Sequence, residues 1–361
     1  MKIGILTFHN AYNYGAVLQT YATQEIVRKY GHSVEIIDYH DAAIDRFYDK
    51  MKFHFKAMPK RNPKSLLVYL IAIYFNWRRN SAFKVFIKNN LILSKHKYLQ
   101  GDKIDWSDYD VFLIGSDQLW NKSLTGGLDR IYWGQFDISV GARKVAWSVC
   151  MNTINMTTDE TSLIKEYLNS FSAISVREDT LQAFISKLTK TKIWHTLDPT
   201  LLLPTQRWED VCHPVKESNY IAVYAVRKEE ETISFARQLA LKLNKKLIII
   251  RSYSLWHFSS ENKEYCGPDD FLSYIKNADY VVTSSFHGTV FSLIFQRQFV
   301  CPMLDGNIRV EDLLKTAGLS DRFVRDCKEA LSLPLIEYNH LSKQLELRKK
   351  ETIDFLSNVL K

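Results

Sequence analysis

The sequence of 361 residues lacks several features that would assign it quickly to a class of protein. Its five cysteines are scattered and form no CxxC pair, which argues against a disulfide framework or a cysteine zinc site and fits a reducing cytoplasm. The amino-terminal stretch has no signal-peptide pattern. The longest uncharged apolar run, at 66–75, is far shorter than the ~20 residues of a transmembrane helix. We therefore expect a cytoplasmic protein without a membrane span.

Acidic residues are absent between Asp49 and Asp102, although the chain as a whole carries a formal net charge of only +8. Basic and aromatic residues alternate through this segment, at 50–97. The pattern is typical of helices with a solvated basic face, of a surface that binds an anionic membrane, or of a nucleic-acid interface. High apolar content and the lack of a recognisable nucleic-acid module favour the membrane among the functional interpretations. We expect no nucleic-acid partner.

The first predicted loop lacks the G-x-G-x-x-G fingerprint of dinucleotide-binding proteins. It lies between a predicted strand at 2–7 and a predicted helix at 16–31, and another strand follows at 32–39, so the three form a βαβ unit. The side chains that this loop offers to a cleft or turn are His9, Asn10, Asn13 and Gly15. They are compatible with a turn whose backbone N–H groups face an anion, and equally with an ordinary capped turn.

Strand and helix patterns alternate along the rest of the chain, and its length fits two hydrophobic cores. We predict an α/β protein with two Rossmann-like domains that face each other across a cleft. The first domain spans 1–205 and includes the basic segment, the second spans 206–335, and a helix at 336–361 packs back across the junction.

Polar residues follow the predicted strands, where parallel α/β sheets bind their ligands. Asp117 suits a base or a helix cap, Trp120 a sugar platform or the core, and Asp198, before a proline, a turn. The stretch "TSSFHG" interrupts two apolar runs, and we predict that it forms an anion site. Its candidate residues are Ser284, Ser285, His287 and Gly288. The sequence shows no DxD motif and no cluster of histidines and carboxylates, so no metal site is predicted.

The stretches "GILTFHNAYNYGAVLQTYA", "GSDQLWN", "ISVRED", "DPTLLL", "SSFHGTVFSLIF" and "NIRVEDLLKTAGLSDRFV" occur in this order from residue 2 to about residue 325. In order and spacing they resemble the polysaccharide pyruvyl transferase family. The resemblance implies a fold similar to GT-B glycosyltransferases, with 1–205 on the acceptor side and 206–335 on the donor side. It also implies transfer of the pyruvyl group of phosphoenolpyruvate onto a glycan or lipid-linked oligosaccharide as a ketal, with no cofactor beyond this co-substrate.

By the same resemblance, Arg177 matches the family arginine associated with the donor, and His287 matches its histidine. Arginine forks onto carboxylate or phosphate, and a histidine near neutrality can transfer protons, so these types suit the donor. Many members have an arginine two residues before the histidine, where this chain has Ser285. Arg309 and Arg251 are the candidates to replace it.

Three functions therefore follow as hypotheses. The first is pyruvyl transfer, with Arg177 as anion clamp, His287 as acid or anion ligand and Asp117 as base, at the inner face of the cell membrane. The second is a glycosyltransferase that uses a nucleotide-sugar donor. The third is a non-catalytic member of the family that binds a glycan.

Overall fold

The computed structural model describes residues 1–50, 63–226, 229–251, 261–263, 266–303, 307–341 and 343–361. The part of the basic segment at 51–62 lies outside these residues. The chain divides into two units, of which the first comprises Met1–Lys50, Ile87–Leu203 and Leu347–Lys361. The second comprises the described residues of 63–86 and 204–346. The segment at 63–86 thus groups with the second unit, whereas the sequence placed all of 50–97 in the first domain.

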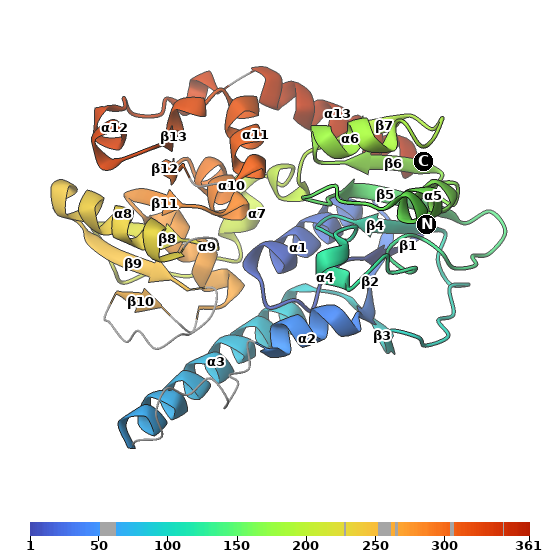
Figure 1. The fold of residues 1–361 in the computed structure, drawn as a ribbon, viewed down its shortest axis with the longest axis horizontal. Coiled ribbons are helices and arrows are strands. Elements are labelled where there is room, and N and C mark those ends of the chain that lie inside the picture. The colour runs from blue at the N-terminus through green and yellow to red at the C-terminus, as the bar shows by residue number, and fades with distance from the viewer. Residues whose placement is uncertain (51–62, 227–228, 252–260, 264–265, 304–306, 342) are drawn as a thin grey trace. The chain divides into compact units, whose positions relative to one another are not determined.

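The first unit is built on a seven-stranded parallel sheet with the order β3-β2-β1-β4-β5-β6-β7 (Figure 1). The order reverses between β1 and β4, and open α/β sheets bind ligands at such a switch point, beyond the carboxyl ends of the strands. The strands are β1 (Lys2–Leu6), β2 (Ser33–His40), β3 (Leu93–Leu99), β4 (Val111–Gly115), β5 (Arg143–Val149), β6 (Ala173–Val176) and β7 (Ile193–His195).

The helices of this unit begin where the sequence supplies caps. Asn13 accepts a hydrogen bond from the Ala16 N–H and starts α1, which is buried from Tyr14 to Val27. Thr157 and Glu160 form a capping box at the start of α5. The helices are α1 (Tyr14–Lys29), α2 (Ala42–Lys50), α4 (Lys122–Thr125), α5 (Thr158–Leu168), α6 (Asp179–Ile185) and the 3₁₀ helix η2 (Pro199–Leu201), and α3 (Pro63–Asn90) is divided between the units after Phe86.

The second unit has a six-stranded sheet with the order β10-β9-β8-β11-β12-β13, again parallel, and its switch point lies between β8 and β11. Its strands are β8 (Tyr220–Tyr224), β9 (Lys246–Ile250), β10 (Asn262–Lys263), β11 (Tyr280–Thr283), β12 (Gln298–Pro302) and β13 (Phe323–Val324). Its helices are α7 (Thr205–Glu209), α8 (Glu229–Leu243), α9 (Pro268–Asn277), α10 (Phe286–Ile294), α11 (Ile308–Ala317), η3 (Ser320–Arg322), α12 (Cys327–Ser332) and η4 (Tyr338–His340).

The last helix, α13 (Lys343–Val359), returns to the first unit, as predicted. The Phe355 ring stacks on Trp147 with 6.0 Å between ring centroids. The Thr352 hydroxyl accepts a hydrogen bond from the Leu197 N–H at 3.0 Å. These contacts tie the end of the chain to β5 and to the loop after β7. The prediction of an α/β protein with two Rossmann-like domains is therefore confirmed.

One element of the first sheet escaped prediction. Strand β3, with the sequence LSKHKYL, lies at the edge of the sheet and its side chains are mostly exposed. An edge strand buries too little to show an alternating apolar pattern, and its lysines discourage pairing with another chain. From the sequence alone this part of the chain is therefore recognisable only as basic, and no strand is predicted there.

Candidate functional site

Gln19 of α1 joins the two strand ends at the switch point of the first sheet. Its amide donates to Thr7 Oγ1 at 2.8 Å, and its carbonyl oxygen accepts from the Ser116 N–H at 3.2 Å. At the end of β4, Gly115 has a φ of 143°, and a Cβ there would lie 1.8 Å from the Trp147 carbonyl oxygen. Only glycine fits this close approach. Gly115 therefore lets the end of β4, where the loop with Asp117 begins, lie against the backbone of β5.

Two histidines and two carboxylates form a hydrogen-bonded group at the carboxyl ends of β1 and β2. His9 Nε2 and His40 Nε2 lie 2.8 and 2.9 Å from the same oxygen, Oδ1 of Asp38. His40 Nδ1 lies 3.1 Å from Oδ2 of Asp45, which belongs to α2. The Asn10 side-chain amide lies 2.8 Å from His40 Nδ1 and donates to Asp45 Oδ1, also at 2.8 Å.

Sequence reasoning singled out His9 and Asn10 but missed their partners in this group. The available signal was the spacing of Asp38 and His40, two residues apart at the end of a strand. Side chains at that spacing lie on the same side of a strand. What the sequence does not show is that the first loop brings His9 to the same place.

The hydrogen bonds within this group shift the pKa values of Asp38 and His40 in opposite directions. Burial alone would raise the pKa of Asp38, but hydrogen bonds from His40 and His9 outweigh it and hold the pKa below its ordinary value. Burial would lower the pKa of His40, yet its bonds to Asp38 and Asp45 raise that pKa to about 9. At neutral pH His40 is therefore an imidazolium between two carboxylates.

The predicted donor clamp, Arg177, follows β6 in the first unit and is engaged by carboxylates. Its Nη1 donates to Asp198 Oδ2, and its Nη2 lies 3.8 Å from Asp117 Oδ1. The side chains of Arg177 and Asp198 are 5% and 0% exposed. Asp198 also caps η2 by accepting from the Thr200 N–H at 2.9 Å, which agrees with its prediction as a turn residue. The structure thus brings Asp117, Arg177 and Asp198 together.

Two other predicted residues of the first unit have plainly structural positions. Gly15 lies inside α1, so it does not form the turn that was considered for it. Trp120 is fully buried and stacks on Trp133 with 4.2 Å between ring centroids, and its Nε1 donates to the Tyr132 carbonyl oxygen at 3.0 Å. Because its ring face and N–H are both engaged in the core, the sugar-platform interpretation of Trp120 is corrected to core packing.

The stretch at 283–288 forms the turn from β11 into α10, beside the switch point of the second sheet. Ser285 caps the helix by accepting from the Gly288 N–H at 3.4 Å, and its own N–H donates to Thr283 Oγ1 at 3.1 Å. A Cβ at Gly288 would lie 2.1 Å from Thr283 Oγ1, so the helix packs closely on its strand. His287 is buried, 8% exposed, and the Ser284 carbonyl oxygen accepts from the Asn307 side chain at 3.2 Å.

The two arginines considered as substitutes for the missing one lie in different surroundings. Arg251 follows β9 and is 3% exposed, with its Nη1 2.9 Å from Glu229 Oε1. Arg309, in the first turn of α11, holds its guanidinium 5.8 Å from the centroid of the Phe286 ring. Phe286 begins α10, so Arg309 is the arginine that the described residues place beside the turn containing His287.

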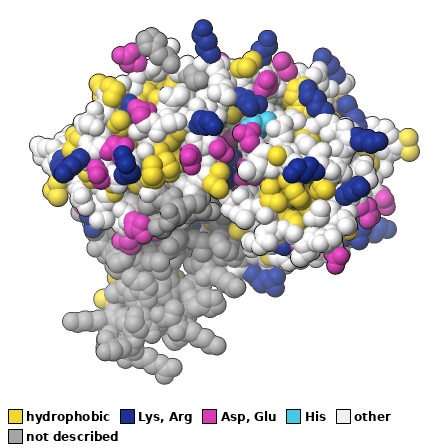
Figure 2. Space-filling view, turned by 45° about the horizontal axis from the view of Figure 1, so that its top comes forward, with side chains coloured by type: hydrophobic (Ala, Val, Ile, Leu, Met, Phe, Trp, Pro, Cys, Tyr) yellow, Lys and Arg dark blue, Asp and Glu magenta, His cyan; other side chains and the backbone are white. Residues whose placement is uncertain are grey.

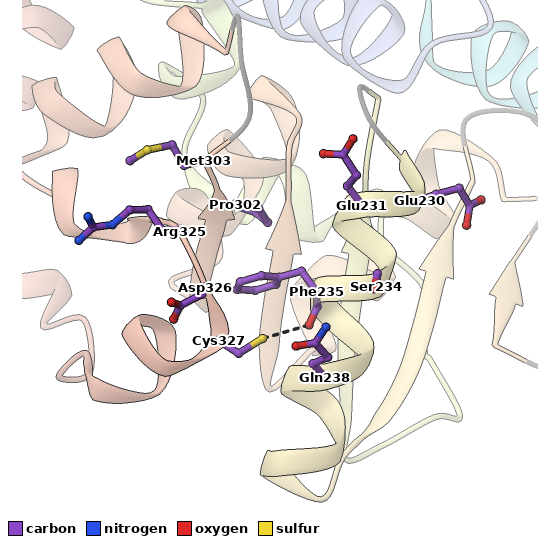
Figure 3. A pocket seen from close by; sticks show the side chains of 10 residues that line it. All are labelled: Glu230, Glu231, Ser234, Phe235, Gln238, Pro302, Met303, Arg325, Asp326 and Cys327. Carbon is purple, nitrogen blue, oxygen red and sulfur yellow. Dashed lines mark hydrogen bonds between the residues drawn. The ribbon is translucent and has the colours of Figure 1, made fainter.

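A pocket of about 630 Å³ lies elsewhere in the second unit, between the start of α8 and the ends of β12 and β13 (Figure 3). Glu230, Glu231 and Asp326 line it together with Arg325, so carboxylates predominate. Such a lining disfavours an anionic donor. None of the predicted donor residues lines it. The space therefore does not coincide with the predicted anion site.

Basic and acidic side chains are mixed on the one face of the molecule that Figure 2 draws. Within the part of the chain that the structure describes, no helix is long and apolar enough to cross a bilayer.

Comparisons with known proteins bear on both fold and family. A family model described as polysaccharide pyruvyl transferase matches residues 13–301. No curated protein gives a significant match. The solved structure of UDP-GlcNAc 2-epimerase from Neisseria meningitidis, bound to UDP-GlcNAc, is 8% identical with a TM-score of 0.50, over 99% of this chain and 100% of that chain.

Two further similar structures have lower scores. The UDP-GlcNAc 2-epimerase from Methanocaldococcus jannaschii is 11% identical, with a TM-score of 0.49 over 99% of this chain and 100% of that chain. The glycosyltransferase SsfS6 from Streptomyces sp. SF2575 is 13% identical, with a TM-score of 0.37 over 99% of this chain and 96% of that chain. Because both TM-scores are below 0.5, these two structures support no conclusion about this chain. At these identities the likeness concerns the fold alone.

Proposed function

Because the chain belongs to the polysaccharide pyruvyl transferase family, we propose that it transfers the pyruvyl group of phosphoenolpyruvate onto a sugar as a pyruvate ketal. The sugar is part of a bacterial surface polysaccharide or of its lipid-linked precursor. The observation that carries this proposal is the family match across residues 13–301. The residues at the strand ends of both units give it chemical support.

Ketal formation sets the requirements for the site. The methylene carbon of phosphoenolpyruvate gains a proton, which leaves positive charge on the neighbouring carbon. One sugar hydroxyl bonds to that carbon, phosphate leaves, and a second hydroxyl forms the second bond. The two hydroxyls release two protons, of which one balances the proton gained by the methylene carbon and the other leaves with phosphate. The reaction therefore needs an acid, a base, and cationic groups for the carboxylate and phosphate of the donor.

The turn from β11 into α10 supports binding of the donor in the second unit. The amino terminus of a helix carries partial positive charge, which favours an anion. His287 lies in the first turn of α10 and serves as acid or anion ligand, with Ser284, Ser285 and Gly288 around it. Arg309 supplies the permanent charge that Ser285 lacks, since its guanidinium lies over the Phe286 ring in the same turn.

Asp117 serves as the base on the acceptor side. It follows β4 at the switch point of the first sheet, where its Oδ1 accepts from the Gln118 N–H at 2.9 Å. Its side chain remains 13% exposed, so a sugar hydroxyl can reach it. Arg177 enters the proposal as the residue that holds Asp117 and Asp198, because its own guanidinium is already paired.

Donor binding is the first test. Calorimetry with phosphoenolpyruvate and a panel of nucleotide sugars should give a signal for phosphoenolpyruvate alone. The variants His287→Ala and Arg309→Ala should lose that signal. Arg325→Ala is the matched control, because Arg325 is a 77% exposed arginine of the same unit that lines the acidic pocket, and it should bind as the wild type does.

Turnover is the second test. Phosphate release from phosphoenolpyruvate should depend on a sugar with two neighbouring hydroxyls, and mass spectrometry should detect the pyruvyl ketal. Binding of a nucleotide sugar alone would refute pyruvyl transfer and indicate a glycosyltransferase. A glycan that binds without turnover of any donor would indicate a non-catalytic member.

We further propose that α3 holds the enzyme at an anionic membrane surface, where lipid-linked acceptors reside. Its exposed apolar residues Leu66, Leu70, Ile73 and Trp77 recur at helical spacing, and exposed basic residues follow at Arg78, Lys84 and Lys88. Flotation with anionic vesicles should be lost in Trp77→Glu and weakened by Arg78→Glu with Lys84→Glu. Lys246→Glu, an exposed lysine of β9, is the control. Flotation that depends neither on the charge of the lipid nor on these substitutions would rule out this membrane role.

A further inference from the structure

The group formed by His9, Asp38 and His40 has the donor set of a metal site. Two imidazole nitrogens and one carboxylate oxygen, each from a different side chain, lie within 4.8 Å of one another. Each nitrogen is Nε2, and the two lie 2.8 and 2.9 Å from Asp38 Oδ1. Ligand atoms that share a tetrahedral ion at ~2.0–2.2 Å are themselves roughly 3.3–3.6 Å apart, so a movement of about 0.5 Å would turn these hydrogen-bond separations into those of a metal site.

The second ring nitrogen, Nδ1, of each histidine faces an oxygen that holds the ring in its orientation. The His9 Nδ1 faces the Thr7 carbonyl oxygen at 3.3 Å, and the His40 Nδ1 faces Asp45 Oδ2 at 3.1 Å. Histidines that bind metals usually donate their second N–H to a carbonyl or carboxylate in this way, which directs the lone pair of the other nitrogen to the ion.

The Asp38 oxygen that both rings face favours a positive charge beside it, either a proton on a ring nitrogen or a bound metal ion. A neutral imidazole has one N–H, yet both nitrogens of His9 and Nε2 of His40 each face an oxygen that can only accept. Nδ1 of His40 faces both Asp45 Oδ2 and the Asn10 side-chain amide. If each Nδ1 carries the proton, each Nε2 presents its lone pair to a carboxylate. Without a metal ion, the proton on His40 supplies the positive charge; a metal ion bound by all three atoms would displace that proton and take over its role.

We propose that His9, Asp38 and His40 bind a divalent transition-metal ion. Two imidazoles and a carboxylate suit zinc, cobalt, manganese or ferrous iron better than calcium or magnesium, which prefer oxygen ligands alone. Asp45 and the Thr7 carbonyl orient the ligands. Asp38 and His40 are 17% and 14% exposed, so an ion can reach the group from solvent.

The place of the group in the fold agrees with a functional ion. It lies at the carboxyl ends of β1 and β2, beside the switch point where Thr7 and Ser116 are joined by Gln19. An ion there could coordinate a hydroxyl of the acceptor and make it more acidic. This role rests on the proposed function, whereas the binding of the ion does not.

A second group in the chain serves as an internal comparison. His213, Asp269 and Asp270 also come within reach of a common ion, but their side chains are 47%, 32% and 31% exposed. Asp270 is already used to cap α9 through the Gly267 N–H at 2.9 Å. We therefore expect weak binding there at most.

The test is direct titration of the purified, chelator-treated full chain with zinc and with cobalt. We expect one tightly bound ion per chain, with visible absorption bands in the cobalt form. Asp38→Asn and His40→Gln should lower the affinity by more than about 100-fold, because they remove ligands, and Asp45→Asn by about 10–100-fold with the stoichiometry kept. His213→Gln is the matched control and should leave the tight ion in place.

Thermal unfolding keeps the test independent of activity and of folding defects. Zinc should raise the melting temperature of the wild type and of His213→Gln, but not that of a folded Asp38→Asn. If the ligand variants do not fold, Asp45→Asn provides the test, because Asp45 is 39% exposed and is not a ligand. Zinc should then bind this variant more weakly than the wild type, and an unchanged affinity would overturn the proposal. Absence of a bound ion in the wild type would overturn the proposal, and so would binding that survives Asp38→Asn or disappears in His213→Gln. Binding of phosphoenolpyruvate, measured in parallel, reports on the proposed function separately.

Discussion

Arg177 and Asp198 form a buried ion pair whose removal should be costly. Their side chains are 5% and 0% exposed, so neither charge is solvated by water when its partner is absent. Removing one member of such a pair typically costs about 3–5 kcal/mol of the free energy of unfolding. Arg177→Met should fall in this range, because it leaves Asp198 without its cation and brings no new partner for Asp117.

Asp198→Asn should cost less, roughly 2–3 kcal/mol, for two reasons. The asparagine oxygen can still accept from the Thr200 N–H and keep the cap of η2. Asp117, 3.8 Å from Arg177 Nη2, continues to offset the guanidinium charge. The double variant should cost less than the sum of the singles by about 1–3 kcal/mol, since the second change removes a charge that the first left unpaired.

Urea unfolding followed by tryptophan fluorescence and circular dichroism measures these differences. The matched control is the exposed pair of Arg207 and Asp210, with side chains 50% and 46% exposed, where Arg207→Met should cost less than about 1 kcal/mol. A cost below about 1 kcal/mol for Arg177→Met as well would refute the structural role. If the same variant also lost phosphoenolpyruvate binding, Arg177 would be the donor clamp that the family resemblance implies.

Three further substitutions test local packing. Gly115→Ala should prevent stable folding of the first unit, because its Cβ would lie 1.8 Å from the Trp147 carbonyl oxygen at a φ of 143°; expression and melting temperature report it. Gly288→Ala should lower the free energy of unfolding by about 1–3 kcal/mol through its 2.1 Å approach to Thr283 Oγ1, and Thr283→Ala in the same chain should restore part of it. Trp120→Ala should cost about 3–5 kcal/mol as a core cavity, and glycan affinity of the folded fraction should stay unchanged.

The fold was largely predictable from local patterns. Continuous apolar runs such as 2–7 and 220–226 mark buried parallel strands, and the intervening periodic segments mark helices, so two parallel α/β domains follow with little ambiguity. Strand β3 shows where this reasoning stops. An edge strand buries little, so its residues carry charge instead of an apolar pattern.

The sequence predicted that the candidate site residues lie at the ends of strands, but it did not predict which side chains they contact. Residues after strand ends gather at one edge of a parallel sheet, which is why Asp117 and His287 could be singled out as candidates before their surroundings were known. Trp120 follows a strand as well, yet it is buried against Trp133. Whether a polar or aromatic side chain after a strand turns inward depends on the loop that covers it.

The sequence by itself determined the fold class, the family and the residue types at the strand ends, because periodicity and motif order are properties of the chain. Only the tertiary structure decided which of these residues meet. It pairs Arg177 with Asp198, 21 positions along the chain, and brings His9 onto Asp38, 29 positions away. Such contacts depend on the order of strands in the sheet and on the course of loops, which no local pattern encodes. The histidine and carboxylate group, and the metal ion proposed for it, therefore became visible only in three dimensions.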